Sequence, residues 1–132
     1  MAKGNKVALL KVVLVIFAVV SIIYGLGYLI VPGKMITLSG ANPVDFEWLR
    51  WPGGVIIALG IGALLVVRKP EKQNIFVFIC ALSTLLAGLG KLYCYIMKEY
   101  SGSIMFIVMP TVLLLAISGL LWWGRERAKG IL

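Results

Sequence analysis

The stretch that decides the fold runs from Val12 to Val31 and reads VVLVIFAVVSIIYGLGYLIV. It contains no charged residue, and its length matches the roughly 20 residues that an α-helix needs to cross the hydrocarbon core of a bilayer. The run is longer than the apolar part of a signal peptide, and no clear small-residue cleavage site follows it. The pattern therefore predicts a retained membrane-spanning helix.

Three further apolar runs of similar length follow, at about 49–67, 75–97 and 104–123. Together the four runs explain why 61% of the 132 residues are hydrophobic, far more than a soluble domain of this size needs. Backbone groups in lipid must hydrogen-bond internally, and the alternating polarity of barrel strands is absent, so we expect helices. The predicted fold is all-α, with residues 1–132 forming a single domain, an integral membrane four-helix bundle.

Basic residues predict the orientation of the bundle. They gather before the first run, between the second and third runs, and after the fourth, at Lys3, Lys6, Lys11, Arg68, Lys69, Lys72, Arg125, Arg127 and Lys129. Four spans would bring all three segments to the same side, and the positive-inside rule makes that side cytoplasmic for both termini. We expect a multi-pass protein of the bacterial inner membrane. A basic rim beside anionic membrane lipids explains the net charge of +8, so no nucleic-acid partner is expected.

The residue types argue against several chemistries. The chain has no histidine, which disfavours histidine-ligated haem and the common zinc sites, and neither a metal nor a cofactor is predicted. Cys80 and Cys94 would lie roughly 20 Å apart on one helix, too far for a disulfide. The first run has no acid of the kind that small multidrug exporters carry in their first span. These observations favour a non-enzymatic role.

Small residues mark candidate helix-packing positions. Gly54, Ala58 and Gly62 recur every four residues on the second span, which is the small-xxx-small spacing that lets helices approach closely. Gly88 lies on a similar face of the third span, with Cys80, Thr84 and Ala87. We expect these faces to pack against other helices.

Two cations lie on the same small-residue faces. Arg50 continues the stripe of Gly54, and Lys91 follows Gly88, about 9 Å below the outer end of its helix. The second span starts outside and the third ends outside, so both cations should point inward in one leaflet. Intramembrane charges of this kind tend to be functional.

Two interpretations of this pair remain open. Asp45 and Glu47 could bind the two cations in a salt-bridge cluster that locks the outer helix ends together. Alternatively, the cations could form a pocket for an anionic or carbonyl headgroup, such as a lipid phosphate, a quinone or a small acid. The candidate ligand-binding residues are Arg50, Lys91, Glu47, Asp45, Tyr24, Tyr28 and Tyr95.

The connector from Pro32 to Trp48 is expected to be irregular, because Pro32, Gly33, Gly40 and Pro43 interrupt regular structure. It could fold over the pocket as a lid or be a plain connector. A short echo, GLGxL, occurs at Gly25–Leu29 and again at Gly88–Leu92. It hints at two duplicated hairpins, with chance as the alternative.

The order of features resembles a family of small bacterial four-helix membrane proteins of unknown function, similar in architecture to DoxX-like proteins. The resemblance is carried by a proline-closed first span, FEWLRWPGG at 46–54, ALGIG at 58–62, RKP at 68–70 and AGLGK at 87–91. Members of this family typically show an arginine before a glycine pair, as Arg50 does here. They tend to have an arginine at the position of Lys91, and lysine keeps the charge without the planar fork. The resemblance implies the fold and keeps a link to membrane redox systems open.

Three classes of function follow. The first is a non-catalytic accessory protein that associates with itself or joins a larger membrane complex. The second is a lipid-binding or small-molecule-binding protein, including a transporter, that uses the Arg50–Lys91 pocket. The third is a quinone-linked subunit of a redox system. Membrane lipids are expected partners in all three.

Overall fold

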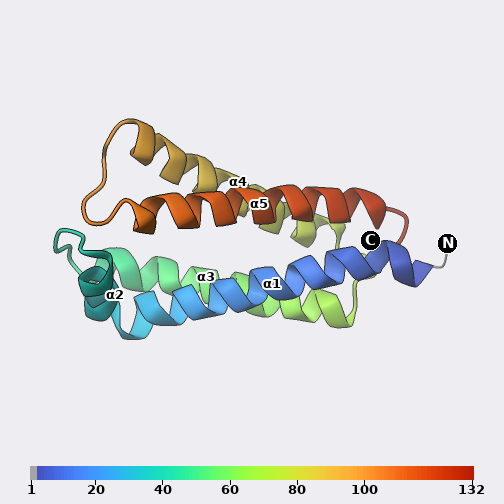
Figure 1. Ribbon diagram of the computed structural model, residues 1–132. Coiled ribbons are helices and arrows are strands. Elements are labelled where there is room, and N and C mark those ends of the chain that lie inside the picture. Colours follow the sequence, from blue (N-terminus) through green and yellow to red (C-terminus); the bar gives the residue numbers. More distant parts are fainter. Residues whose placement is uncertain (1–2) are drawn as a thin grey trace.

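The computed structural model describes residues 3–132, and this part of the chain contains helices and no strand. The helices are α1 (Lys3–Ile30), α2 (Pro32–Ser39), α3 (Glu47–Arg68), α4 (Asn74–Ile96) and α5 (Met105–Arg127), in the arrangement of Figure 1. The predicted all-α class is therefore confirmed.

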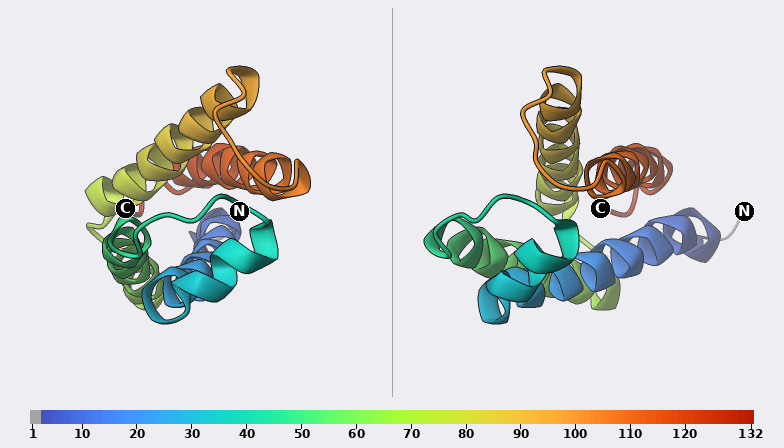
Figure 2. Two further views of the ribbon diagram at one scale, coloured as in Figure 1. Left: turned by 90° about the vertical axis from the view of Figure 1, so that its left-hand side faces the viewer. Right: turned by 60° about the vertical axis from the view of Figure 1, so that its left-hand side comes forward.

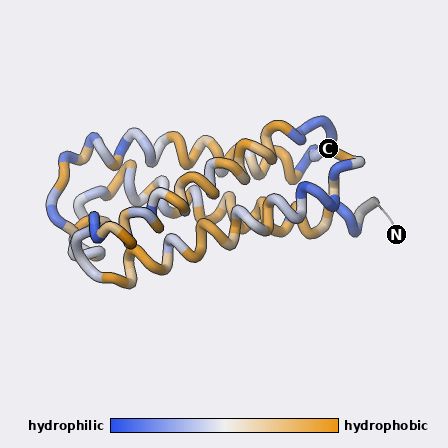
Figure 3. The backbone as a smooth tube through the Cα atoms, turned by 90° about the horizontal axis from the view of Figure 1, so that it is seen from above, coloured by the Kyte–Doolittle hydropathy of each residue, from blue (hydrophilic) through white to orange (hydrophobic). Residues whose placement is uncertain are grey.

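Four of these helices are long and apolar enough to cross a membrane. They cover Asn5–Ile30, Glu47–Arg68, Asn74–Ile96 and Met105–Arg127, close to the four predicted runs. Hydrophobic residues dominate the middle of the bundle, and hydrophilic residues gather towards its two ends (Figure 3). This distribution is that of a multi-pass membrane protein, because only the helix ends meet water and headgroups.

The connector between the first two spans differs from the expectation, because its first half is the helix α2. Pro32 stands at the start of α2, where its missing N–H costs no hydrogen bond. Gly40 ends the helix with φ 69°, in the left-handed conformation that glycine adopts without strain. Two of the four residues that suggested an interruption, Pro32 and Gly40, thus mark the two ends of a short helix.

The long helices form two antiparallel pairs. The helix α1 packs mainly on α3, and α4 mainly on α5, with α1 also touching α5 (Figures 1 and 2). Gly25 and Gly53 make the first pairing possible, since a Cβ on Gly53 would lie 2.8 Å from the carbonyl oxygen of Gly25. In the second pair, the Ser118 hydroxyl donates to the Ala81 carbonyl at 3.0 Å in a buried position.

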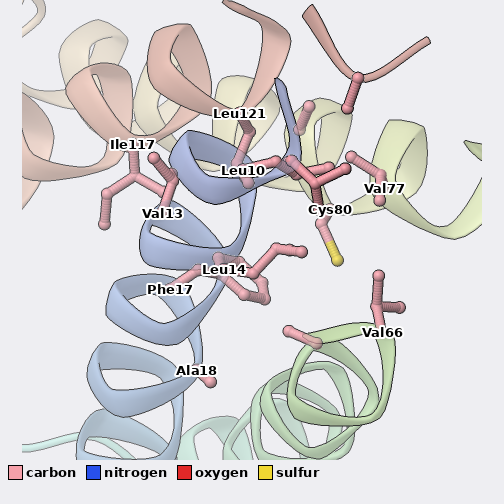
Figure 4. Close-up of a cluster of buried hydrophobic side chains, with 14 residues drawn as sticks. Leu10, Val13, Leu14, Phe17, Ala18, Val66, Val77, Cys80, Ile117 and Leu121 are labelled. Atoms are coloured by element: carbon pink, nitrogen blue, oxygen red, sulfur yellow. The ribbon is translucent and has the colours of Figure 1, made fainter. Parts of the chain in front are cut away.

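The start of α1 and the C-terminus lie at one end of the bundle, which we call the terminal end (Figure 1). The opposite end, the loop end, carries α2 and the connectors before α3 and α5. The buried hydrophobic cluster lies towards the terminal end, where Leu10, Leu14 and Leu121 are fully buried beside Val77 and Cys80 (Figure 4). The largest fully buried side chains of this cluster therefore lie away from the loop end.

Arg125 joins α4 to α5 at the terminal end. Its Nε donates to Asn74 Oδ1 at 2.8 Å, and its guanidinium lies 5.4 Å from the ring centroids of both Phe78 and Trp122. The two rings meet edge to face at 5.3 Å. Trp122 therefore packs within the α4–α5 pair.

The predicted packing positions fall into two groups. A Cβ on Gly88 would lie 2.7 Å from Leu115 of α5, and one on Gly62 would meet Phe76 of α4. A Cβ on Gly54 would have nothing within 4 Å, and Ala58 is exposed. The face of α3 that packs on α1 instead carries the buried Gly53 and Gly60. The predicted stripe of Gly54, Ala58 and Gly62 therefore does not coincide with the face of α3 that packs on α1.

Candidate functional site

Two adjoining hollows lie between the helix pairs. The first, which we call the inner chamber, has a volume of about 210 Å³ and is walled by all four long helices. Its lining is mostly aliphatic and aromatic, and comprises Phe17, Val20, Ser21, Tyr24, Tyr28, Ile56, Leu59, Ser83, Thr84, Ala87, Lys91, Pro110, Leu113, Leu114 and Ile117. An apolar hollow between helices is a common form of ligand site.

The second hollow, the vestibule, lies at the loop end and measures about 510 Å³. Its walls come mainly from α1, α2 and α5 and from the two loop-end connectors, including Met35, Ser39, Asn42, Tyr100, Ser101 and Ser103. The connectors are joined by two hydrogen bonds, from Asn42 N to Ser101 Oγ at 2.8 Å and from Ser103 N to the Ser39 carbonyl at 3.0 Å. These bonds hold the wall of the vestibule in place.

Four residues border both hollows, namely Tyr24, Tyr28, Lys91 and Pro110, and we call them the neck. The rings of Tyr24 and Tyr28 lie 6.1 Å apart, one helical turn from each other on α1. Pro110 lies inside α5 and has no N–H to donate along the helix. The neck lies between the almost wholly apolar inner chamber and the vestibule, whose mostly apolar wall also carries serine and asparagine side chains.

Most of the other hydroxyls around the two hollows are bonded to the backbone; those of Ser21 in the inner chamber and Tyr100 in the vestibule are exceptions. Ser83 donates to Ile79, and Thr84 donates to Cys80 and Ala81, so these groups add little polarity to the inner chamber. In the vestibule, Ser39 Oγ donates to the Ile36 carbonyl, and Ser101 Oγ accepts from Asn42 N. By contrast, the side chains of Tyr24, Tyr28 and Lys91 have no hydrogen-bond partner within residues 3–132.

Lys91 also has no ion-pair partner in the described part of the chain. The salt bridges there involve Glu126 at the terminal end, with Arg125 at 3.3 Å and with Lys129 at 3.6 Å. Asp45 and Glu47 are exposed at the start of α3 and line neither hollow. Among the described residues, no acid pairs with the Lys91 ammonium.

Arg50 takes a different place from the one expected. Its Nη1 donates to the Leu29 carbonyl at 2.7 Å, and its guanidinium lies 5.8 Å from the ring centroid of Phe46. Leu29 belongs to the last turn of α1, whose carbonyls lack helical N–H partners and favour a cation. Arg50 therefore caps α1 and lies outside the lining of both hollows.

Of the seven predicted site residues, the structure brings Tyr24, Tyr28 and Lys91 together. Tyr95 is exposed and stacks on Tyr100, with ring centroids 6.2 Å apart, and Tyr100 in turn lines the vestibule. No group of three or more metal-binding side chains lies together within the described residues.

Ala87 and Pro110 line the site but were not among the predicted ligand-binding residues. Helical spacing placed Ala87 on the same face of α4 as Lys91, but as a packing residue, and the structure puts it in the wall of the inner chamber. Pro110 meets the other neck residues only because α5 packs beside α4 and α1. No pattern along the sequence gives that pairing.

Residues 9–124 match a family described as a domain of unknown function, DUF4345. The chain belongs to this family. The expectation of a membrane family without an assigned function is confirmed, whereas the likeness to DoxX stays a prediction. Neither the curated proteins nor the solved structures gave a match. Every residue that lines the two hollows falls within the DUF4345 match, so the site belongs to the domain itself.

Proposed function

We propose that this DUF4345 protein is a non-catalytic integral membrane protein that binds a lipophilic small molecule between its two helix pairs. The observation that carries the proposal is the inner chamber, an apolar hollow that ends in three unpartnered polar side chains at the neck. A hollow with this polarity gradient suits a molecule that is apolar along its length and polar at one end.

The size of the inner chamber supports binding. Its volume of about 210 Å³ exceeds the roughly 150 Å³ at which an apolar protein cavity accommodates an aromatic ring. The Ser83 and Thr84 hydroxyls are bonded to their own helix, so an apolar occupant would leave neither of them without a partner. The bilayer supplies such occupants at high local concentration.

The setting we propose is the bacterial inner membrane, with the terminal end in the cytoplasm. Basic residues of both termini and of the connector after α3 support this orientation through the positive-inside rule. The vestibule would then open on the outer side. Self-association is compatible with binding, since Gly54 and Ala58 lie free on the surface of α3.

Native mass spectrometry after extraction in a mild detergent tests the proposal. We expect a non-protein mass to remain with the wild-type chain and to be lost in Ala87→Phe, whose ring would fill the inner chamber. Ala116→Phe is the matched control, because Ala116 is an exposed alanine on α5 outside both linings. Equal retention by Ala87→Phe and Ala116→Phe, or no retained molecule in any of the three proteins, would contradict the proposed function.

A further inference from the structure

The neck carries an electrostatic imbalance. Lys91 is the one charged residue in the lining of either hollow, and no acid of the described residues pairs with it. Lys91 is half-buried, on the inward side of α4. A half-buried ammonium is stabilised by an anion or by several acceptors, and the described residues bond it to neither.

The hydrogen-bonding groups at the neck point to one kind of ligand. The ammonium is a donor with three protons and no lone pair, and each tyrosine hydroxyl can donate one more. None of these three groups, on Tyr24, Tyr28 and Lys91, is used by the described part of the chain. A carboxylate or phosphate, which offers several acceptor oxygens and negative charge, complements them.

The two hollows on either side of the neck differ in polarity. The inner chamber continues from the neck between aliphatic side chains such as Leu59 and Leu113. The wall of the vestibule is also mostly apolar, but it adds the polar residues Ser39, Asn42, Ser101 and Ser103 of the loop end. A ligand whose head sits at the neck therefore has an apolar path for a chain on one side. The limited volume of the inner chamber, about 210 Å³, suits one chain and not two.

We propose that the ligand is an amphiphile with an anionic, oxygen-bearing head and one apolar chain. Its head, a carboxylate or a phosphate monoester, contacts the Lys91 ammonium and the hydroxyls of Tyr24 and Tyr28, and its chain enters the inner chamber. This inference rests on the proposed function and narrows it. A neutral head such as a quinone carbonyl would leave the lysine charge uncompensated.

Three probes with the same chain and different heads test the inference. Delipidated full-length protein in detergent is incubated with an equimolar mixture of octanoate, octyl phosphate and octanol, whose short chain matches the inner chamber, at a pH where both acids are ionised. The molecules that remain after gel filtration are then quantified by mass spectrometry. We expect the better retained of the two anionic probes to exceed the alcohol about tenfold or more, as for hydrogen bonds to a charged group. The ratio between carboxylate and phosphate identifies the preferred head.

Variants of Lys91 test whether the preference for anionic probes comes from the neck. Lys91→Met should reduce the preference for anionic probes to about one, and Lys91→Arg should keep most of it, because the charge remains. Lys98→Met is the matched control, since Lys98 is an exposed lysine at the loop end outside both linings. If Lys91→Met does not fold, the inference is still tested by the preference of the wild-type chain for anionic probes and by whether Lys91→Arg keeps it.

The outcomes separate this inference from the proposed function. Equal retention of all three probes by the wild-type chain, or an unchanged preference in Lys91→Met, would overturn the anionic head. The lipophile site would then stand on its own, provided that Ala87→Phe still loses the probes. Release of the bound probes by inorganic phosphate at the same concentration as the probes would also overturn the inference, because the apolar chain would then add nothing to the affinity.

Discussion

Arg50 and Lys91 show how partners decide the role of a charged residue. Both lie near the loop end, and both lie on helix faces rich in small residues. Arg50 donates to the last turn of α1, at 2.7 Å from the Leu29 carbonyl, and lies against the ring of Phe46. Lys91 has no such partner among the described residues and faces the two hollows. We therefore assign a structural role to the first and a ligand-binding role to the second.

Replacing Arg50 by Met separates the two roles. We expect a loss of about 1 kcal/mol in the free energy of unfolding, the size of a cation's contribution at a helix C-terminus. Retention of the bound lipophile should be unchanged. Chemical unfolding in detergent, followed by tryptophan fluorescence, measures the first quantity, with the exposed Lys34→Met on α2 as the control. Loss of the ligand without loss of stability would show that the assignment of Arg50 is wrong.

The glycine contact between α1 and α3 makes a prediction at the scale of the helix. In Gly53→Ala, the new methyl would lie 2.8 Å from the Gly25 carbonyl oxygen and 3.0 Å from Leu29 N, so the two backbones must separate. We expect a loss of roughly 1–3 kcal/mol in unfolding free energy. Gly54→Ala is the neighbouring control, with nothing within 4 Å of the added methyl. Equal losses in the two variants would mean that α3 packs on a different face.

The free face of α3 makes a second prediction. Ala58 is exposed within the chain, so Ala58→Leu should leave the unfolding free energy of the monomer nearly unchanged. If Gly54 and Ala58 meet a second copy, the larger side chain should lower the fraction of cross-linked dimer in native membranes. Ala116→Leu, on an exposed part of α5, is the control. If Ala58→Leu leaves the dimer fraction unchanged, the chain does not associate with a second copy through this face of α3.

Helix by helix, the sequence is informative where length and composition decide the structure. The four spans follow from runs of about 20 apolar residues, which only helices can satisfy in lipid. The helix α2 was not predicted, because Pro32 and Gly40 were interpreted as interruptions of regular structure. Proline is nevertheless common at the first position of a helix, and glycine is common just after its last residue. A proline followed eight residues later by a glycine is therefore the sequence signal that identifies α2.

The site is harder to foresee, because it depends on which helices are neighbours. Tyr24, Tyr28 and Lys91 can be proposed on their own helix faces, but the structure brings them together only because α4 faces α1 across the bundle. The spacing of Arg50 to Gly54 predicts an inward position, but the buried face of α3 passes through Gly53 instead. One residue along a helix turns the direction by about 100°, enough to move a side chain from the interior to the end of a neighbouring helix.

At the scale of the whole molecule, the orientation in the membrane is open to a direct experiment. In a chain carrying Cys80→Ala and Cys94→Ala, an impermeant thiol reagent applied to intact cells should label Lys98→Cys and not Lys129→Cys. Both positions are exposed lysines, at the loop end and the terminal end respectively. We expect this pattern because the terminal end is rich in basic residues, and by the positive-inside rule such segments stay in the cytoplasm. The opposite labelling pattern would invert the proposed topology.

The most direct test of the central claim is an electron-density map of the wild-type protein purified in mild detergent without delipidation. We predict elongated non-protein density in the inner chamber between the two helix pairs, ending within hydrogen-bonding distance of Lys91 Nζ. A map in which side chains of the protein itself close the inner chamber, with Lys91 paired to one of the chain's own carboxylates, would contradict the account.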